Sequence, residues 1–325
     1  MLPKNVKWIF CGGMIRSGST LQYQLVCNLV ERAGLGSKGG FYDGGRELDE
    51  YASPQGITVV KSHIFDMHIQ KTFLKDEAIA FYIYRDIRDV AVSAMYKFSV
   101  TFADLLNKQW LDYAINVGSL WESQNKVRSF RYEESTNDIE GFIKATADYL
   151  GIEINIGDIQ ELAQEHSLTE QRKRADYLKQ RGLKIDDVTQ LHSDHIFTGT
   201  TGIWRESLDR IQQDTLNILY GDWLRQKDYE VSQEDNNLAE SIAHWRKGDY
   251  MRQRENVSNL IRSRAELTLR IENMQARLKE LKELKEFKNV AQNRIKYLVQ
   301  QKTELEVELN ALKHRYRLFE KLLGR

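Results

Sequence analysis

Short apolar runs alternate with stretches of helical periodicity through the first two thirds of the chain. The runs that predict strands cover residues 7–12, 56–63, 78–84 and 126–132. Apolar residues spaced three and four apart predict helices over residues 21–32, 87–96 and 142–149. Apolar strands that alternate with amphipathic helices are typical of a parallel sheet covered by helices on both faces. We therefore predict an α/β fold for this part of the chain.

The last quarter of the chain has a different pattern, in which apolar residues recur at alternating steps of three and four. One register consists of Leu260, Leu267, Ile271, Met274, Leu278 and Leu281, and a second of Ala291, Ile295, Leu298, Leu305, Leu309, Leu312, Tyr316 and Phe319. Such a stripe between Glu and Lys predicts a long α-helical coiled coil, with a phase slip where the registers meet. Because a lone helix would leave this seam in water, we expect a homo-oligomer; a fold-back hairpin with its turn in residues 285–293 is the alternative.

The sign of the net charge changes at the same place in the chain as the apolar pattern. Residues 1–251 hold 29 Lys and Arg against 37 Asp and Glu, a net charge of −8, whereas residues 252–325 hold 18 against 10, a net charge of +8. Both prolines and all six tryptophans precede residue 252. These shifts predict a globular domain over residues 1–235, a helical linker over residues 236–251 and the coiled coil over residues 252–325.

The composition also limits the class of protein. The longest apolar runs, such as residues 79–84, are too short to cross a bilayer, and no apolar run follows a basic start at the N-terminus. Two cysteines, Cys11 and Cys27, make neither a disulfide framework nor a zinc site. We expect a cytoplasmic protein with no transmembrane segment and no nucleic-acid partner. The basic C-terminal body leaves peripheral attachment to a membrane as an alternative.

The first predicted strand leads into a glycine-containing loop and then a helix. This arrangement directs backbone N–H groups and a helix N-terminus at a phosphate. Gly13 and Gly18 have the spacing of a P-loop, but Ser19 stands where a nucleotide triphosphatase carries lysine, and the cation is Arg16 inside the loop. The loop therefore predicts a P-loop-type sheet that binds an anion rather than one that hydrolyses ATP.

Two further predicted strands end in residues that suit an anionic ligand. Lys61 and His63 end the second strand, two residues apart and so on one face, and Arg85 directly follows the buried run 78–84. Ligands of open parallel sheets bind beyond the carboxyl ends of the strands. These residues and the glycine loop are therefore expected to meet at one site.

Together these motifs resemble the sulfotransferase family that uses 3′-phosphoadenosine 5′-phosphosulfate (PAPS). The run Arg16-Ser17-Gly18-Ser19-Thr20 is similar to the family's 5′-phosphosulfate loop, and the run Lys61-Ser62-His63 to the Lys-Thr-His of its cytosolic branch. Arg85 and Ser93, eight residues apart, resemble its 3′-phosphate motif. Further similar elements are Gly118-Ser119-Leu120-Trp121, Tyr132-Glu133-Glu134 and residues 199–205. The motifs stand in the family's order and extend from residue 7 to about residue 230.

The resemblance implies transfer of a sulfuryl group from PAPS to a hydroxyl or amine of an acceptor, with adenosine 3′,5′-bisphosphate (PAP) as product and no metal. It makes His63 the general base, for which an imidazole pKa near 6.5 is suitable, and makes Lys61 the cation at the leaving oxygen. The implied PAPS-binding residues are Arg16, Ser17, Gly18, Ser19 and Thr20 at the 5′-phosphosulfate, Arg85, Ser93, Thr198 and Gly199 at the 3′-phosphate, and Tyr132 near adenine.

The sequence departs from the family pattern at two places. Phe197 and Thr198 stand where the family has Arg-Lys at the 3′-phosphate, so that Thr198 offers only a hydroxyl. Leu21 replaces a tryptophan that commonly stacks on adenine. The missing Arg-Lys keeps open a non-catalytic coiled-coil scaffold with a degenerate nucleotide fold. A P-loop small-molecule kinase is the other alternative, which Ser19 at the lysine position disfavours. The acceptor is left open among polysaccharide, lipid and small molecule.

Overall fold

The computed structural model describes residues 2–3, 5–54, 56–186, 189–192, 199–232, 259, 262–282, 288–289, 292–304 and 306. The chain divides into two compact units, Met1–Glu266 and Leu267–Arg325. The predicted linker over residues 236–251 lies outside the described residues. The domain boundaries at residues 235 and 251 therefore stay predictions.

The first unit is built on a five-stranded parallel sheet. Its strands are β1 (Trp8–Gly13), β2 (Gly36–Tyr42), β3 (Ile57–Ser62), β4 (Ala78–Tyr84) and β5 (Val127–Arg131), in the spatial order β2-β3-β1-β4-β5. The parallel sheet expected from the sequence is thereby confirmed, and four strands lie where the apolar runs predicted them. The edge strand β2 was not predicted, because Gly36, Lys38 and Gly39 interrupt any apolar pattern.

The chain crosses between the strands through helices. The described helices of the first unit are α1 (Ser19–Arg32), η1 (Leu48–Tyr51), α2 (Met67–Leu74), α3 (Ile87–Phe98), α4 (Phe102–Asn107), α5 (Trp110–Glu122), α6 (Tyr132–Asn137), α7 (Ile139–Leu150), α8 (Ile156–Glu165), α9 (Leu168–Gln180), α10 (Trp204–Ser207) and α11 (Arg210–Gln226). A short antiparallel pair, β6 (Ile185–Asp186) and β7 (Leu191–His192), follows α9. The helices predicted over residues 21–32, 87–96 and 142–149 correspond to α1, α3 and α7.

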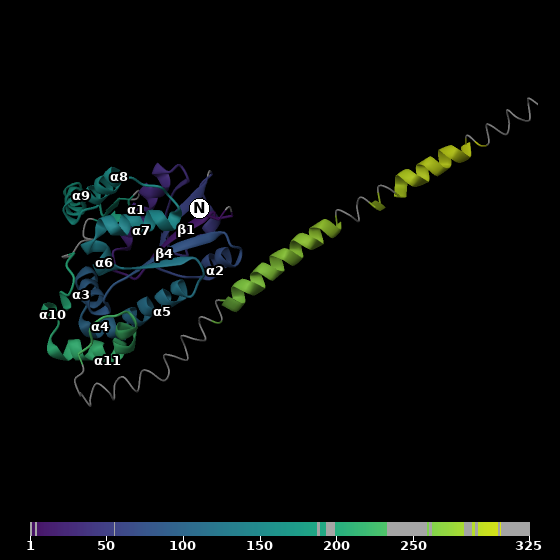
Figure 1. Cartoon of the computed structure of the whole chain (residues 1–325). Helices are drawn as coiled ribbons and strands as arrows, with labels where there is room; N and C mark the ends of the chain where they lie inside the picture. Colours follow the sequence, from purple (N-terminus) through teal and green to yellow (C-terminus); the bar gives the residue numbers. More distant parts are fainter. Residues whose placement is uncertain are drawn as a thin grey trace, which may run out of the picture. The chain divides into compact units, whose positions relative to one another are not determined.

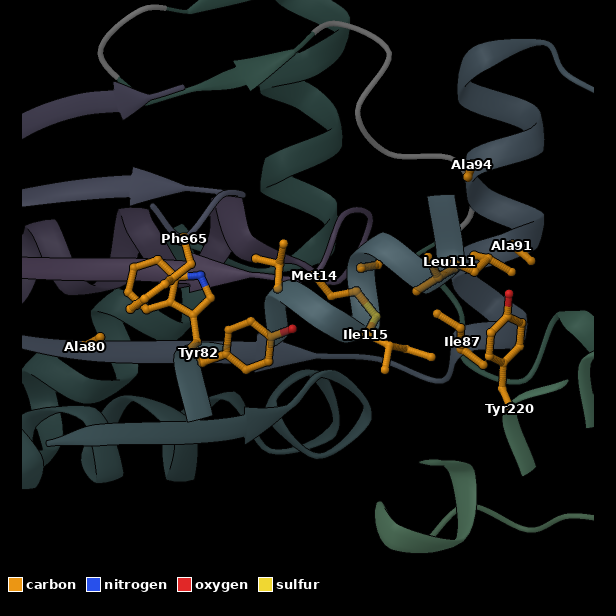
Figure 2. Close-up of a cluster of buried hydrophobic side chains, with 14 of the residues drawn as sticks. Met14, Phe65, Ala80, Tyr82, Ile87, Ala91, Ala94, Leu111, Ile115 and Tyr220 are labelled. Carbon is orange, nitrogen blue, oxygen red and sulfur yellow. The ribbon is translucent and has the colours of Figure 1, made fainter. Parts of the chain in front are cut away.

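Two apolar cores cover the two faces of the sheet, as the alternation along β1 requires. Trp8 and Phe10 point into one core with α2, α3, α5 and α11, and Ile9 and Cys11 point into the other with α1, α7 and α8. Figure 1 shows α1 and α7 on the opposite side of the strands from α2 and α5. Figure 2 shows Met14, Tyr82, Ile87 and Ile115 side by side in the first core. Burial on both faces explains why β1 and β4 are continuous apolar runs.

The sheet topology also fixes the position of a ligand site. β1 lies between β3 and β4; the connection that leaves β1 runs towards β2, whereas the connection from β3 to β4 runs in the opposite direction across the sheet, so a crevice opens beside β1 where the direction reverses. The carboxyl ends of these three strands carry the glycine loop, His63 and Arg85. The fold thus brings the three predicted strand-end motifs to one edge.

The described part of the second unit is helical over residues 267–282 and 292–304, and the described residues 262–266 before it are helical as well. Five residues of the first predicted register are 55–63% exposed, namely Leu267, Ile271, Met274, Leu278 and Leu281. Helix formation agrees with the prediction, whereas coiled-coil pairing stays a prediction. None of the helices in the described ranges is long and apolar enough to span a membrane.

Candidate active site

The loop between β1 and α1 is shaped to expose backbone N–H groups. Gly18, at the N-cap position of α1, has a left-handed φ of 83° and no side chain with which to cap the helix. A Cβ at Gly18 would lie 2.7 Å from the Tyr132 ring, and a Cβ at Gly13 would lie 2.6 Å from Cβ of Ser19. Both glycines are therefore required for the close packing of the loop. The first turn of α1 is left open to a ligand that accepts hydrogen bonds.

Two arginines meet at one side of this loop. Arg16 Nε donates to Ser93 Oγ at 2.9 Å, and Arg85 Nη1 lies 3.4 Å from the carbonyl oxygen of Arg16. Arg85 is 5% exposed, and its guanidinium carbon lies 4.5 Å from the centre of the Tyr132 ring. Its buried Nε–H has no hydrogen-bond partner in the part of the chain that the structure describes. A buried guanidinium with an unused donor, beside a second arginine, is suited to a phosphate.

A buried carboxylate fixes the position of Arg85. Asp89 Oδ2 accepts from Arg85 Nη2 at 3.4 Å and from the backbone N–H of Gly202 at 2.8 Å, and Oδ1 accepts from the N–H of Trp204 at 3.0 Å. Arg85 Nη2 also donates to the carbonyl oxygen of Thr200 at 2.7 Å. Asp89 therefore connects the start of α3 with the segment that follows Gly199.

Lys61 and His63 lie against the first turn of α1, as their shared strand face predicts. Lys61 Nζ donates to Thr20 Oγ1 at 2.7 Å. His63 Nδ1 lies 2.8 Å from the carbonyl oxygen of Gly13, and Nε2 lies 3.5 Å from Ser19 Oγ. Since a carbonyl oxygen only accepts, Nδ1 carries the proton of the neutral ring and Nε2 is left as the basic nitrogen.

Burial lowers the pKa of both side chains. Desolvation, assisted by the Arg16 charge, lowers the pKa of Lys61 to about 8. Desolvation and the neighbouring Lys61 charge lower the pKa of His63 to about 4, although the Gly13 carbonyl opposes the shift. The expectation of a pKa near 6.5 for His63 is corrected by this burial. His63 is consequently neutral, with Nε2 unprotonated, throughout the physiological range.

A cavity of about 600 Å³ lies beside these groups. Of the predicted site residues, those that line it are Arg16, Gly18, Ser19, Thr20, Arg85, Ser93, Tyr132 and Gly199. Lys61 and His63 reach the lining through Thr20 and Ser19. Ser17 is fully buried, and its hydroxyl contacts the carbonyl oxygens of Met14 and Ile83 at 2.6 and 2.9 Å, so it holds the loop to β4. Thr198 lies outside the described residues.

The cavity also has walls that sequence reasoning missed. The additional lining residues are Leu21, Thr136, Asn137, Ile139, His166, Ser167, Leu168, Gln171, Leu191, Thr200, Thr201 and Ile203. Several come from the junction of α8 and α9, where Ser167 caps α9 by accepting from the N–H of Glu170. A Ser-x-x-Glu pattern of this kind signals a helix start in a sequence. It carries no information on which side of the helix faces a ligand.

Comparisons with known proteins agree with this geometry. The family model described as a sulfotransferase domain matches residues 9–228. The chain belongs to this family. The match begins at β1 and ends just after α11, so it contains the whole cavity lining and excludes the C-terminal helices. A comparison with curated proteins gave no significant match.

Solved structures of low sequence identity share the fold of the sulfotransferase domain. A retinol dehydratase in complex with androsterone and inactive cofactor PAP is 19% identical, with a TM-score of 0.52 over 71% of this chain and 84% of its own. A complex of mouse sulfotransferase SULT7A1 with PAP is 16% identical, with a TM-score of 0.54 over 73% of this chain and 88% of its own. These structures support the sheet order and its helical layers.

The described residues contain no group of three or more His, Cys, Asp or Glu side chains arranged to hold a metal ion. The polar groups around the cavity are arginines, hydroxyls, backbone N–H groups, the amides of Asn137 and Gln171 and the His166 imidazole, with Lys61 and His63 behind Thr20 and Ser19. Such groups suit an anionic organic ligand that brings its own phosphates.

Proposed function

We propose that this sulfotransferase-family protein transfers a sulfuryl group from PAPS to a hydroxyl or amine of an acceptor. The observation that carries the proposal is that one cavity is lined both by the start of α1, whose N-cap Gly18 has no side chain to cap the helix, and by the buried guanidinium of Arg85. PAPS carries a phosphosulfate and a separate 3′-phosphate, and two structural neighbours were solved with PAP. Two separated groups of this kind fit a donor with two separate anionic ends better than they fit a nucleotide such as ATP, whose phosphates form a single chain.

PAPS supplies the activated sulfuryl group when it is bound. Ser19, Thr20 and the N–H groups of the first turn of α1 hold the 5′-phosphosulfate, and Arg85 with Ser93 holds the 3′-phosphate. Arg16 is assigned to the 5′-phosphosulfate as well, as the resemblance implies; its Nε, which donates to Ser93 Oγ, adds positive charge beside the residue that holds the 3′-phosphate. Gly199 lets the backbone approach the same phosphate, and Tyr132 packs beside Arg85 next to the base.

His63 acts on the acceptor. Nε2 removes the proton from the acceptor hydroxyl or amine as the new bond to sulfur forms and the bond from sulfur to the 5′-phosphate oxygen breaks in line. The Gly13 carbonyl holds the Nδ1 proton and so keeps Nε2 basic. A bound donor anion raises the low pKa of His63 because it favours the protonated ring that forms during the reaction. Lys61 stabilises the charge that develops on the leaving oxygen.

The donor is tested by a thermal shift assay on the purified full-length protein. We expect PAP to raise the melting temperature and ATP with Mg²⁺ to leave it unchanged. Stabilisation by ATP alone would favour a small-molecule kinase, and no response to either nucleotide would favour a scaffold with a degenerate nucleotide fold.

The base is tested by the substitution His63→Ala. Turnover of a sulfated acceptor, found by incubating radiolabelled PAPS with fractions of polysaccharide, lipid and small molecules, should fall about 10²- to 10⁴-fold. The affinity for PAP should change little, because His63 is behind Ser19 and does not line the cavity. Wild-type turnover in this variant would contradict the role of His63.

We also propose that the C-terminal helix makes the protein a homo-oligomer. The exposed residues Leu267, Ile271, Met274, Leu278 and Leu281 form one stripe along residues 262–282. A continuous apolar stripe of this length is stable in water only when a second apolar surface covers it. We also propose a cytoplasmic location. Attachment of the basic C-terminal body to a membrane surface is the alternative.

A further inference from the structure

A chain of buried amide side chains forms the wall of the cavity at α9. Gln24 Nε2 donates to the backbone carbonyl oxygen of Thr189 at 2.9 Å. Because a carbonyl oxygen accepts only, this bond fixes the orientation of the Gln24 amide, whose Oε1 faces α9. Gln171 Nε2 donates to Gln24 Oε1 at 2.9 Å. The same Nε2 lies 3.2 Å from His166 Nδ1, to which it donates its second proton.

These bonds fix the orientation of the Gln171 amide as well. Both of its N–H groups are used by Gln24 and His166, and its Oε1 accepts no hydrogen bond from the residues that the structure describes. Gln171 is 7% exposed and lines the cavity. Oε1 is therefore the atom of the Gln171 amide that these bonds leave for a ligand in the cavity, and a hydrogen-bonded chain that ends on the backbone holds its orientation.

The surroundings of Gln171 suit a flat uncharged ring. The apolar side chains that line the cavity are Leu21, Ile139, Leu168, Leu191 and Ile203, whereas the cations in its lining are Arg16 and Arg85. His166 is also uncharged at neutral pH, since burial lowers its pKa to about 4, with the Arg174 and Arg32 charges adding to the shift. A neutral ring with Nδ1 accepting carries its proton on Nε2, 2.9 Å from Asn28 Nδ2. Because an amide nitrogen does not accept, the Asn28 amide must be turned so that its Oδ1 accepts this proton.

We propose that Gln171 binds the exocyclic amino group of the donor's base through Oε1, and so makes the site selective for adenine over a purine with a carbonyl at that position. The inference rests on the proposed use of PAPS. An adenine amino group donates to Oε1, whereas the carbonyl oxygen of hypoxanthine at the same place would oppose it with a second acceptor. Because the Gln24 bond prevents the Gln171 amide from turning over, the clash cannot be relieved by exchanging its oxygen and nitrogen.

The experiment compares PAP with inosine 3′,5′-bisphosphate by calorimetric titration of the full-length protein. The two nucleotides carry the same phosphates and sugar and differ in the amino group. The wild-type protein should bind PAP about 10- to 100-fold more tightly, the range expected when a buried acceptor loses its partner. Binding of both nucleotides within twofold of each other would overturn the inference. Binding of neither would instead contradict the proposed function.

Two variants separate base recognition from packing. Gln171→Met keeps the length of the side chain and removes the acceptor, so PAP binding should weaken while inosine 3′,5′-bisphosphate binding does not, and the ratio should approach one. Gln70→Met is the matched control, because Gln70 is 5% exposed, donates to Gln124 and does not line the cavity. The ratio of its affinities for PAP and inosine 3′,5′-bisphosphate should equal that of the wild type. Equal weakening of both nucleotides by Gln171→Met would reduce Gln171 to a packing role.

Discussion

The apolar residues of β1 in the first unit are buried, whereas those of the predicted seam in the second unit are exposed. Ile9 and Phe10 of β1 are fully buried between helices that the same chain supplies, whereas Ile271 and Leu278 of the C-terminal helix are 55% and 56% exposed. Both sets follow a regular apolar pattern, with a period set by their secondary structure. The comparison teaches that a pattern predicts which face of an element seeks burial. Whether that burial occurs within the chain depends on the elements that surround it.

Charged residues differ between the units in the same way. In the first unit, Arg85 and Asp89 are 5% and 0% exposed and form bonds that organise the cavity. In the second, Lys302 and Glu306 form an ion pair between side chains that are 77% and 61% exposed. Exposed pairs of this kind contribute little to stability, and buried charges are costly unless they are paired. The buried charges of the first unit are therefore the ones with chemical consequences.

The largest expected effect comes from breaking the exposed stripe. The double substitution Ile271→Glu with Leu278→Glu places two charges on the predicted seam. Each apolar side chain buried in a seam contributes about 1.5–3 kcal/mol, so association should weaken by about 3–6 kcal/mol per protomer. Light scattering should give the mass of a monomer for this variant and a multiple of it for the wild type.

A matched variant distinguishes the seam from charge alone. Asn273→Glu with Ala276→Glu adds the same two charges at exposed positions of the same helix that lie outside the stripe, and its mass should equal that of the wild type. A wild-type protein that is itself monomeric would contradict the oligomer and favour the fold-back hairpin.

The second-largest effect is the loss of stability expected when a buried ion pair loses one partner, compared with the same loss at an exposed pair. Asp89→Asn keeps the shape of the side chain but leaves Arg85 without its carboxylate and turns an amide towards two backbone N–H groups. Loss of one partner of a buried pair costs about 3–5 kcal/mol, so the melting temperature should fall and PAP should bind more weakly. Asp76→Asn removes an exposed partner of Lys126, at 2.6 Å, and should cost less than about 1 kcal/mol. Similar losses in the two variants, measured by urea unfolding, would refute the argument.

These comparisons also show which parts of the structure could be predicted. Strands β1 and β4 were found from the sequence because burial on both faces makes them apolar throughout, and β3 because a short apolar stretch precedes its polar end. The glycine loop, His63 and Arg85 were found because each directly follows such a strand. Local patterns were sufficient wherever the position in the sheet determined the chemistry.

The remaining features depend on contacts between distant segments. Strand β2 is glycine-rich, so nothing local marks it, and Tyr132 begins α6 rather than ending β5 as the sequence suggested. The cavity wall at His166 and Gln171 depends on how α9 packs near α1, which the polar sequence of α9 does not encode locally. The low pKa of His63 likewise follows from its enclosure in the folded protein.

The smallest expected effect concerns the charge on Lys61. Because burial lowers its pKa to about 8, the ammonium that stabilises the leaving oxygen is lost as the pH rises through that value. The kcat/KM of the wild type should therefore be level near neutral pH and fall about tenfold per unit well above pH 8. Lys61→Arg keeps its charge over this range, so its kcat/KM should be lower at pH 7 but should lack the alkaline fall. Lys126→Arg, at an exposed pair, should keep the wild-type profile. If Lys61→Arg retained the same alkaline fall, another group would have to titrate there, and the buried ammonium would not be the charge on which transfer depends.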